Sequence, residues 1–253
     1  MLARRTSARD FRAKHRPMLG EAPTLEKIAE GGEFRHGAIA EAAETYSVET
    51  FGRIISISRQ AFVNDDIGAF TDLSRRLGVV ARSFENAQVV AKLVANPAMS
   101  DGATRFDETA HDNAKAAGGS LDADLAAARP AMRRQTGLSA DLIDVTPRYV
   151  LVPPDLETNM QKKLTAIQAQ ATENANPFSA LTLLVEPGLS AAAQWYVAAD
   201  PATIDSLEYA YLEGAPGPQI ESRAGFEVGG IQICVRLDFG CGWVDHHRWF
   251  RVG

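Results

Sequence analysis

The 253-residue sequence contains only two cysteines, Cys234 and Cys241. So few cysteines exclude a disulfide framework and are typical of a protein from a reducing compartment. No apolar run approaches the ~20 residues that a membrane-spanning helix needs. The net charge of -6 argues against a dedicated nucleic-acid-binding protein, because such proteins usually carry a basic surface. These absences predict a cytosolic, folded protein, and the 45% hydrophobic content is ordinary for a globular chain.

Recognisable catalytic motifs are also missing. The sequence has no GxGxxG, GxxxxGK[ST], GxSxG or HExxH pattern. His111 lies among acids between Asp107 and Asp112, but a nuclease or metal site would need a second histidine nearby, and we find none. We therefore interpret His111 as a solvated loop histidine. The pair Asp65-Asp66 is better explained as a helix N-cap than as a catalytic carboxylate pair.

A zinc site near the C-terminus is not favoured either. Its candidate ligands have irregular spacing and form no CxxC pair; they are Cys234, Cys241, His246 and His247. We interpret them as ordinary C-terminal residues. Three tryptophans are expected to be core or interface anchors, namely Trp195, Trp243 and Trp249. The sequence thus predicts no cofactor, no metal and no catalytic residue.

Charge is unevenly distributed near the N-terminus. Residues 1–16 carry six basic residues against Asp10, a local charge of +5; they are Arg4, Arg5, Arg9, Arg12, Lys14 and Arg16. Residues 20–50 carry seven glutamates against two basic residues, a local charge of -5. The basic segment is either a disordered tail or an extended arm on another subunit, and contact with nucleic acid is a weaker alternative. The opposite charges favour pairing between copies of the chain.

An extended ribbon is predicted next. Residues 45–50 alternate with a period of two, typical of a strand that is wet on one side; Tyr46, Val48 and Thr50 share one face. After Gly52, isoleucines fill both faces, so the strand is expected to enter a core at Ile54, Ile55 and Ile57. Such a ribbon suits a subunit that reaches a neighbour.

A long amphipathic helix over residues 66–95 is the strongest secondary-structure prediction. Apolar or small residues recur at steps of three and four, namely Ile67, Phe70, Leu73, Leu77, Val80, Phe84, Ala87, Ala91 and Val94. At 1.5 Å per residue, the stretch from Ile67 to Val94 is roughly 42 Å long. It ends before Asn96-Pro97, since proline disfavours helix at the preceding residue.

The remainder alternates irregularly between helix and strand. Helices are expected over 121–135, interrupted by Pro130, and over 154–168. Strands are expected at 149–152, 181–185, 194–198 and 204–212, and a hairpin over 226–238. In the last strand, Ile231, Ile233, Val235, Leu237 and Phe239 are expected to face the core, and Gln232, Cys234, Arg236 and Asp238 to face out. No βαβ rhythm recurs, so the fold class is α+β.

Several blocks of the sequence resemble one known family. They are 22–34, Glu44-Thr45-Tyr46, 49–54, 57–61, Asn64-Asp65-Asp66, 99–102, 147–154, Asn176-Pro177-Phe178, 208–214 and 235–240. Together they are similar to major capsid proteins of tailed bacteriophages, in particular to the capsid part of the ClpP-like prohead protease/major capsid protein fusion. The resemblance covers nearly the whole chain from about residue 22.

The resemblance implies the HK97-like capsid fold. It implies an N-terminal arm over 1–32 and an extended β-hairpin (E-loop) over 33–58. A peripheral domain over 59–119, with spine helix 66–95, would follow, and then an axial domain mostly within 120–200. C-terminal strands over 201–253 would return to the subunit body. The fused relatives carry a protease domain before the capsid part; this sequence shows none after Met1, so protease activity is not expected.

The implied function is structural and not enzymatic. Subunits would assemble through pentamers and hexamers into an icosahedral phage head around double-stranded DNA, in the host bacterial cytoplasm. A prohead protease, a portal and decoration proteins are the implied partners. The candidate intersubunit residues are Arg4, Arg5, Arg9, Arg12, Glu33, Phe34, Arg35, Glu41, Glu44, Tyr46 and Glu49. The alternatives are an encapsulin-like or gene-transfer-agent shell and, from another class, a hydrolase using His111 or Asp65/Asp66.

Overall fold

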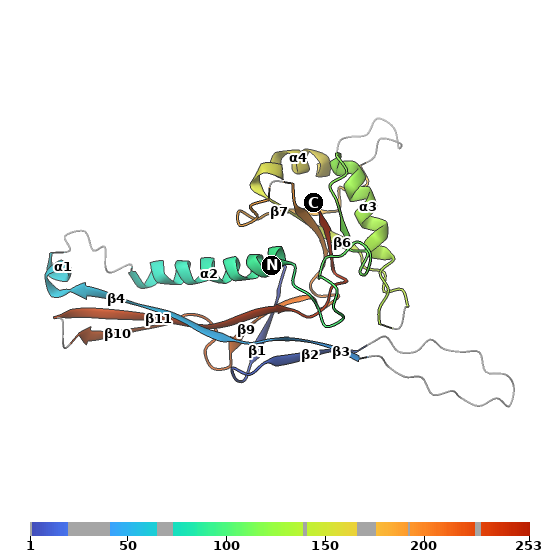
Figure 1. The fold of residues 1–253 in the computed structure, drawn as a ribbon. Coiled ribbons are helices and arrows are strands. Elements are labelled where there is room, and N and C mark those ends of the chain that lie inside the picture. Colours follow the sequence, from blue (N-terminus) through green and yellow to red (C-terminus); the bar gives the residue numbers. More distant parts are fainter. Residues whose placement is uncertain are drawn as a thin grey trace, which may run out of the picture.

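A long strand, β11 (Gly230–Trp243), organises the first of two five-stranded sheets. The computed structural model describes residues 2–19, 41–64, 73–138, 141–165, 176–191, 193–225 and 229–253. The first part of β11 pairs antiparallel with β10 (Gln219–Gly225) on one side and β4 (Glu49–Ser58) on the other. Its last part pairs with β9 (Leu207–Leu212), which pairs in parallel with β1 (Arg4–Ala8). These strands and the helices α1 (Arg59–Val63) and α2 (Leu73–Ala95) form the elongated lobe in Figure 1.

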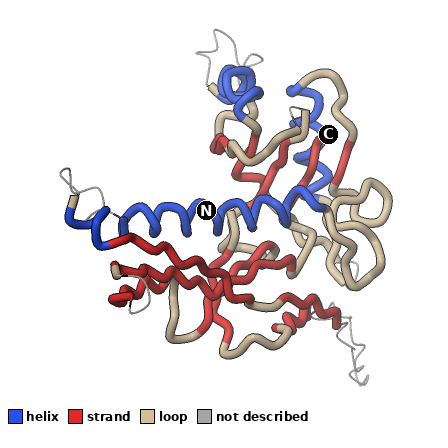
Figure 2. The backbone as a smooth tube through the Cα atoms, turned by 60° about the vertical axis from the view of Figure 1, so that its left-hand side comes forward, coloured by secondary structure: helices blue, strands red, loops and turns tan. Residues whose placement is uncertain are grey.

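The helix α2 lies along one face of this sheet (Figures 1 and 2). Phe84 packs on Phe51 of β4 with a ring-centroid distance of 4.7 Å. The helix ends at Ala95, as predicted, and residues 65–72, including the predicted Asp65-Asp66 cap, lie outside the described residues. The predicted buried stripe is wrong at Val80, which is 64% exposed.

The stripe fails because α2 contacts two different surfaces along its length. Its middle turns face the first sheet, where Ala81 is buried. Its last turns also meet the second lobe, where Val90 and Leu93 join a core cluster with Leu151 and Tyr196. The buried face of the helix therefore changes direction along its length. A single repeat of apolar residues every three or four positions cannot predict such a change.

The second, compact lobe is built on a five-stranded sheet. Its strand order is β5 (Ala114–Lys115), β12 (Trp249–Val252), β8 (Trp195–Ala199), β6 (Pro147–Val152) and β7 (Thr182–Val185). Two helices pack on it, α3 (Leu121–Arg133) and α4 (Pro154–Leu164). Ser120 caps α3 by accepting the Ala123 N–H at 3.4 Å, and Pro130 lies inside this helix without ending it. Leu125, Met132 and Val150 belong to its core.

A third, two-stranded sheet lies outside both lobes' sheets. The strand β2 (Lys14–Leu19) pairs antiparallel with β3 (Glu41–Tyr46), from Lys14 opposite Tyr46 to Leu19 opposite Glu41. Figure 1 shows this hairpin running past the end of the first sheet. The segment predicted as a tail or an arm on another subunit thus contributes two strands, β1 and β2, to its own subunit.

Two predicted side-chain orientations are corrected by the structure. Ile54 was expected in a core and is 58% exposed, because it points to the opposite face of β4 from the buried Ile57. Asp238 was expected to face out and is 4% exposed. Its carboxylate accepts a hydrogen bond from the Thr50 hydroxyl on the paired strand at 2.6 Å. The C-terminal strand β12 joins the second sheet and not the first.

Aromatic residues fill the junction between the lobes. Trp243 ends β11 and Trp249 begins β12, and their rings meet edge to face at 5.9 Å. Phe106 and Tyr196 pack in the same cluster. These tryptophans and Trp195 are buried, which confirms them as core residues. Among the described residues, no helix combines the length and apolar character that a membrane span requires.

Candidate intersubunit surfaces

The base of the β2–β3 hairpin is fastened to the first sheet by a buried ion pair. Glu208 of β9 is completely buried. Its carboxylate contacts Arg16 Nη2 of β2 at 2.5 Å and accepts a hydrogen bond from the Tyr46 hydroxyl of β3 at 3.1 Å. Arg16 also reaches Asp205 at 3.2 Å. Burial, and then the charge of Glu208, raise the pKa of Tyr46 well above its usual range, so the phenol stays a donor.

The strand β1 is held at the same place. Arg4 pairs with Asp205, and this hydrogen bond raises the pKa of Arg4. Lys14 Nζ donates to Thr6 Oγ1 at 2.8 Å and to the Ser7 carbonyl at 3.0 Å. Burial lowers the pKa of Lys14. The lysine therefore covers part of the free edge of β1, an edge that would otherwise pair with other chains.

Three of the predicted contact residues remain open to solvent. The guanidinium of Arg5 lies 5.1 Å from the centre of the Tyr211 ring. The side chains of Arg9 and Arg12 are 94% and 90% exposed, and among the described residues their ion pairs, to Glu213 and Asp10, are 4.0 Å and 3.9 Å long. Exposed pairs at such distances contribute little to stability. These arginines are thus the part of the basic segment that is free to meet another molecule.

The predicted glutamate contacts, with Phe34 and Arg35, divide into four groups. Glu44 accepts a hydrogen bond from the Ser100 backbone N–H at 2.7 Å, so it also holds β3 to the subunit. Glu49 is exposed at the start of β4. The backbone of Glu41 pairs with Leu19. The predicted contacts Glu33, Phe34 and Arg35 lie outside the described residues.

Sequence reasoning missed Arg16, Asp205 and Glu208 as the centre of this arrangement. A usable pattern was present, because Glu208 is an acid inside an otherwise apolar and aromatic strand. A carboxylate in such a strand is expected to be buried and paired. The pairing partner could not be read from the sequence, since Arg16 lies 192 positions away.

Large apolar side chains are exposed on the elongated lobe. They come from β4, α1 and α2, and their exposed fractions are 58% for Ile54, 71% for Val63, 64% for Val79 and 64% for Val80. Single exposed apolar residues are normal, but several on one lobe are typical of an interaction surface. This set was not predicted, because the sequence analysis assigned Ile54 and Val80 to the core.

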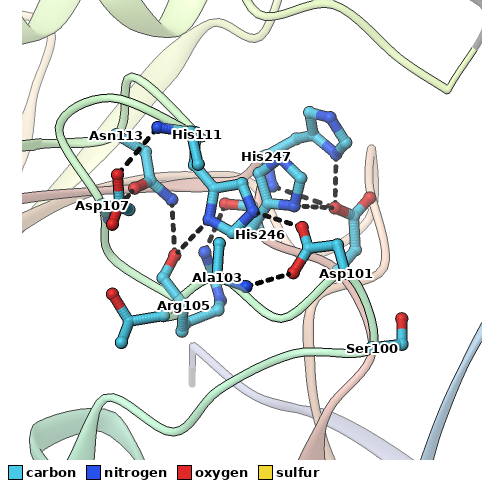
Figure 3. Close-up of polar contacts among 12 residues, drawn as sticks. Ser100, Asp101, Ala103, Arg105, Asp107, His111, Asn113, His246 and His247 are labelled. Atoms are coloured by element: carbon cyan, nitrogen blue, oxygen red, sulfur yellow. Dashed lines mark hydrogen bonds and ion pairs between the residues drawn. The ribbon is translucent and has the colours of Figure 1, made fainter.

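The structure overturns the interpretation of His111 as a solvated loop residue. His111 is 6% exposed, and its ring stacks on that of His246 at 3.9 Å. His246 stacks in turn on His247 at 3.9 Å (Figure 3). A second histidine therefore does lie beside His111, although 135 positions separate them in the sequence. The segment between α2 and β5 folds back on the β11–β12 link, which brings the rings together.

The potential metal-binding atoms of Asp245, His246 and His247 lie within 4.8 Å of one another. The planes of the two stacked rings differ by only 29°. A nitrogen lone pair lies in its ring plane, so two nearly parallel planes do not direct both lone pairs to one ion. In addition, the two ring nitrogens of His247 already contact the Asp245 carboxylate and the Thr136 carbonyl. The arrangement therefore does not favour metal coordination.

Solved structures of viral and related shells share this fold. The capsid of the cyanophage P-SCSP1u aligns with a TM-score of 0.67 at 11% identity, covering 99% of this chain and 86% of that one. The capsid of a native GTA particle gives a TM-score of 0.68 at 10% identity, with 99% and 87% covered. The mature capsid of bacteriophage PhiM1 gives 0.64 at 11% identity, with 99% and 85% covered. No curated protein matches the chain.

The fold is thus that of the HK97-like capsid subunits that build such shells. A family model described as phage capsid protein matches residues 41–252. The chain therefore belongs to the phage capsid protein family, and its role is that of a major capsid protein. The α+β prediction and the capsid resemblance are both confirmed.

Proposed function

We propose that the β2–β3 hairpin, together with residues 20–40, is the contact by which each subunit reaches its neighbour in a closed icosahedral shell. The observation that carries the proposal is the hairpin's position: within the described part of the chain its two strands pair with each other and belong to neither large sheet. A buried ion pair at its base fixes where it leaves the subunit. A rigid base and a projecting hairpin suit a contact made in several slightly different settings, as in pentamers and hexamers.

The division of the chain into capsid domains follows from this assignment. The first sheet with α2 would be the peripheral domain, and the second sheet with α3 and α4 would be the axial domain around the symmetry axes. The hairpin strands would take the E-loop role, first assigned to residues 33–58. In support, Glu49–Ser58 pairs along its whole length with β11 and so belongs to the peripheral sheet.

The open arginines and the exposed apolar residues would provide the remaining contacts. Arg9 and Arg12 lie in the turn region between β1 and β2 and are free to meet acids of a neighbour. Weak contacts suffice in a closed shell, because each subunit engages many at once. We further propose that the shell encloses double-stranded DNA, assembles in the bacterial cytoplasm with a portal, a prohead protease and decoration proteins, and has no enzymatic activity of its own.

A gene-transfer particle is the second candidate, favoured by one observation. The capsid of the native GTA particle aligns with a TM-score of 0.68, as high as the cyanophage capsid. The two particles differ in their contents. Sequencing the DNA extracted from purified particles distinguishes them, since a phage head yields one viral genome and a gene-transfer particle yields random host fragments.

Electron microscopy of two hairpin variants tests the proposed contact. In the first variant, a two-residue Asn-Gly turn replaces residues 20–40; in the second, a Gly/Ser linker of equal length replaces them. Both subunits are expected to keep the wild-type circular dichroism spectrum and to form no closed shells. Closed particles from the short-turn variant would show that the hairpin is not the essential contact.

A further inference from the structure

Three imidazole rings form a continuous stack at the junction between the two lobes. His246 lies in the middle, 3.9 Å from His111 on one side and 3.9 Å from His247 on the other (Figure 3). The planes differ by 19° and 29°, so the rings face each other. All three side chains are at least 86% buried by their exposed fractions of 3%, 14% and 5%.

The two outer rings are each placed between two oxygen acceptors. His111 Nε2 lies 2.7 Å from a carboxylate oxygen of Asp101, and its Nδ1 lies 3.3 Å from the Arg105 carbonyl. His247 Nδ1 contacts the Asp245 carboxylate, and its Nε2 lies 2.9 Å from the Thr136 carbonyl. These contacts hold each outer ring in place from both sides.

The central ring has the opposite environment. Burial first, and then the neighbouring His247 and His111, lower the pKa of His246 to about 3, and Asp245 offsets only part of this shift. Charged and titratable groups face His246 from both packed segments: Asp101, Arg105 and His111 from the segment after α2, and Asp245 and His247 from its own link. Arg105 is completely buried, and its Nη1 donates to the His246 carbonyl at 2.6 Å. A proton on the central ring would thus place a buried charge between two imidazole rings and close to the buried Arg105 cation.

The stack also connects three separate segments of the chain. His111 belongs to the segment between α2 and β5, and His246 and His247 to the link between β11 and β12. Thr136 follows α3, and the neighbouring Gln135 donates to the His111 carbonyl at 2.8 Å. The β11–β12 link carries the chain from the sheet of the elongated lobe to that of the compact lobe.

We propose that this stack is an acid-sensitive latch: protonation of His246 separates the rings and releases the β11–β12 link, which loosens the two lobes from each other. This is a property of the single subunit and goes beyond its role in a shell. The reaction is a simple proton uptake from solvent by one ring nitrogen. No covalent bond changes, and the two carboxylates keep the outer rings in place until the central ring is charged.

The sign of the pH dependence follows from the depressed pKa. In the open or unfolded chain His246 takes up a proton near the ordinary value of 6.5, whereas in the closed stack it does so only near 3. The stabilisation by the neutral ring is therefore complete above about pH 6.5 and is lost as the pH falls toward 3. Asp101 and Asp245 do not titrate in the upper part of this window, because their pKa values lie below the ordinary 3.8.

Hydrogen exchange of the full chain tests the latch. Backbone amides of residues 244–248 are followed between pH 6.5 and 4.5, with rates corrected for the intrinsic pH dependence of exchange. From the two pKa values of His246, the opening equilibrium should rise roughly 50-fold over this interval. Fluorescence of Trp243 and Trp249, which flank the link, should change over the same range.

Two variants without a titrating central ring provide the comparison. His246→Phe keeps a flat aromatic ring in the stack, and His246→Gln keeps a polar side chain should the phenylalanine fail to fold. Both should show corrected exchange that is independent of pH over this interval. His15→Phe, at an exposed position in β2, is the matched control and should behave as the wild type.

Two outcomes would overturn the proposal. A 50-fold rise that persists in both His246 variants would place the titrating group elsewhere. Exchange in the wild type that does not change with pH would show that the stack does not open. A third measurement adds one equivalent of Zn²⁺ at pH 7: strong slowing of exchange by zinc, lost in His246→Gln, would make the cluster a metal site and refute the latch.

Discussion

The ion pair between Arg16 and Glu208 allows a quantitative test of how the hairpin is fastened to the subunit. Replacing Arg16 by methionine leaves a completely buried carboxylate with the Tyr46 hydroxyl as its remaining donor. Breaking a buried pair in this way typically costs 3–5 kcal/mol, and because the Arg16 side chain is 29% exposed we expect about 2–3 kcal/mol. Glu208→Gln should cost about 1–2 kcal/mol, since Arg16 keeps Asp205 at 3.2 Å.

The double variant Arg16→Met/Glu208→Gln isolates the interaction. Its loss of stability should be smaller than the sum of the two single losses by about 1–2 kcal/mol, because the second change removes the carboxylate that the first left unpaired. The free energy of unfolding is measured by urea titration of the unassembled subunit. Arg12→Met, in the same region but 90% exposed, is the control and should change it by less than about 0.5 kcal/mol.

Additive losses of stability in the two single variants would refute this reasoning. If the two single losses sum to the double loss within about 0.5 kcal/mol, the two side chains do not interact in the folded subunit. A second readout concerns the shell. Arg16→Met should also reduce the yield of closed particles at temperatures where the subunit is still folded, because the hairpin would leave the subunit in variable directions.

Three further predictions concern single side chains. Gly240→Ala places a Cβ against the Ser47 carbonyl oxygen and should lower the free energy of unfolding by about 1–3 kcal/mol. Gly78→Ala, with open space around it in α2, should raise the free energy of unfolding by about 0.5–1 kcal/mol. Equal effects of the two substitutions would contradict this packing. Ile54→Ser should leave unfolding unchanged but reduce particle yield in electron micrographs, since this side chain is 58% exposed. Arg9→Glu should impair assembly more at low than at high salt, because exposed charges are screened; a salt-independent loss would mean that shape and not charge is affected.

The sequence predicted the regular elements well where local patterns decide them. The end of α2 before Asn96-Pro97 and the start of α3 at Ser120 depend on neighbouring residues alone, and both are confirmed. The interruption expected at Pro130 is absent, because α3 continues through the proline to Arg133. The helix α4 begins at Pro154 as expected, but it ends at Leu164 and not at residue 168, because Thr165 has an extended backbone and caps it. Caps and flanking prolines act over a few residues, so a single sequence is enough to read them.

Features that depend on distant parts of the chain were not predictable. Val80 was assigned to the core because the helical period continues through it, but the second lobe covers only the last turns of α2. The basic segment was expected to pair with glutamates of another copy, whereas Arg4 pairs with Asp205 in its own chain. Whether the open arginines also contact a neighbour stays a prediction.

The histidine stack shows the same limitation at the level of a site. His111 and His246 carry no motif, and the loop residues around His111 are polar and look solvated in the sequence. Their contact arises because Arg105, completely buried beneath aromatic rings, draws the segment after α2 against the β11–β12 link. A buried arginine without an acid next to it in the sequence gives no local indication of such packing.

The strand β11 has a mechanical consequence for the assembled shell. Its 14 residues run from the far end of the elongated lobe to the junction, and along this length they pair first with β4 and β10 and then with β9. Antiparallel hydrogen bonds lie perpendicular to the strand, so tension along β11 loads them in shear and many of them share the force together. Tension along β11 would therefore act on the subunit in its stiffest direction, and the first place to yield would be the short link beyond Trp243.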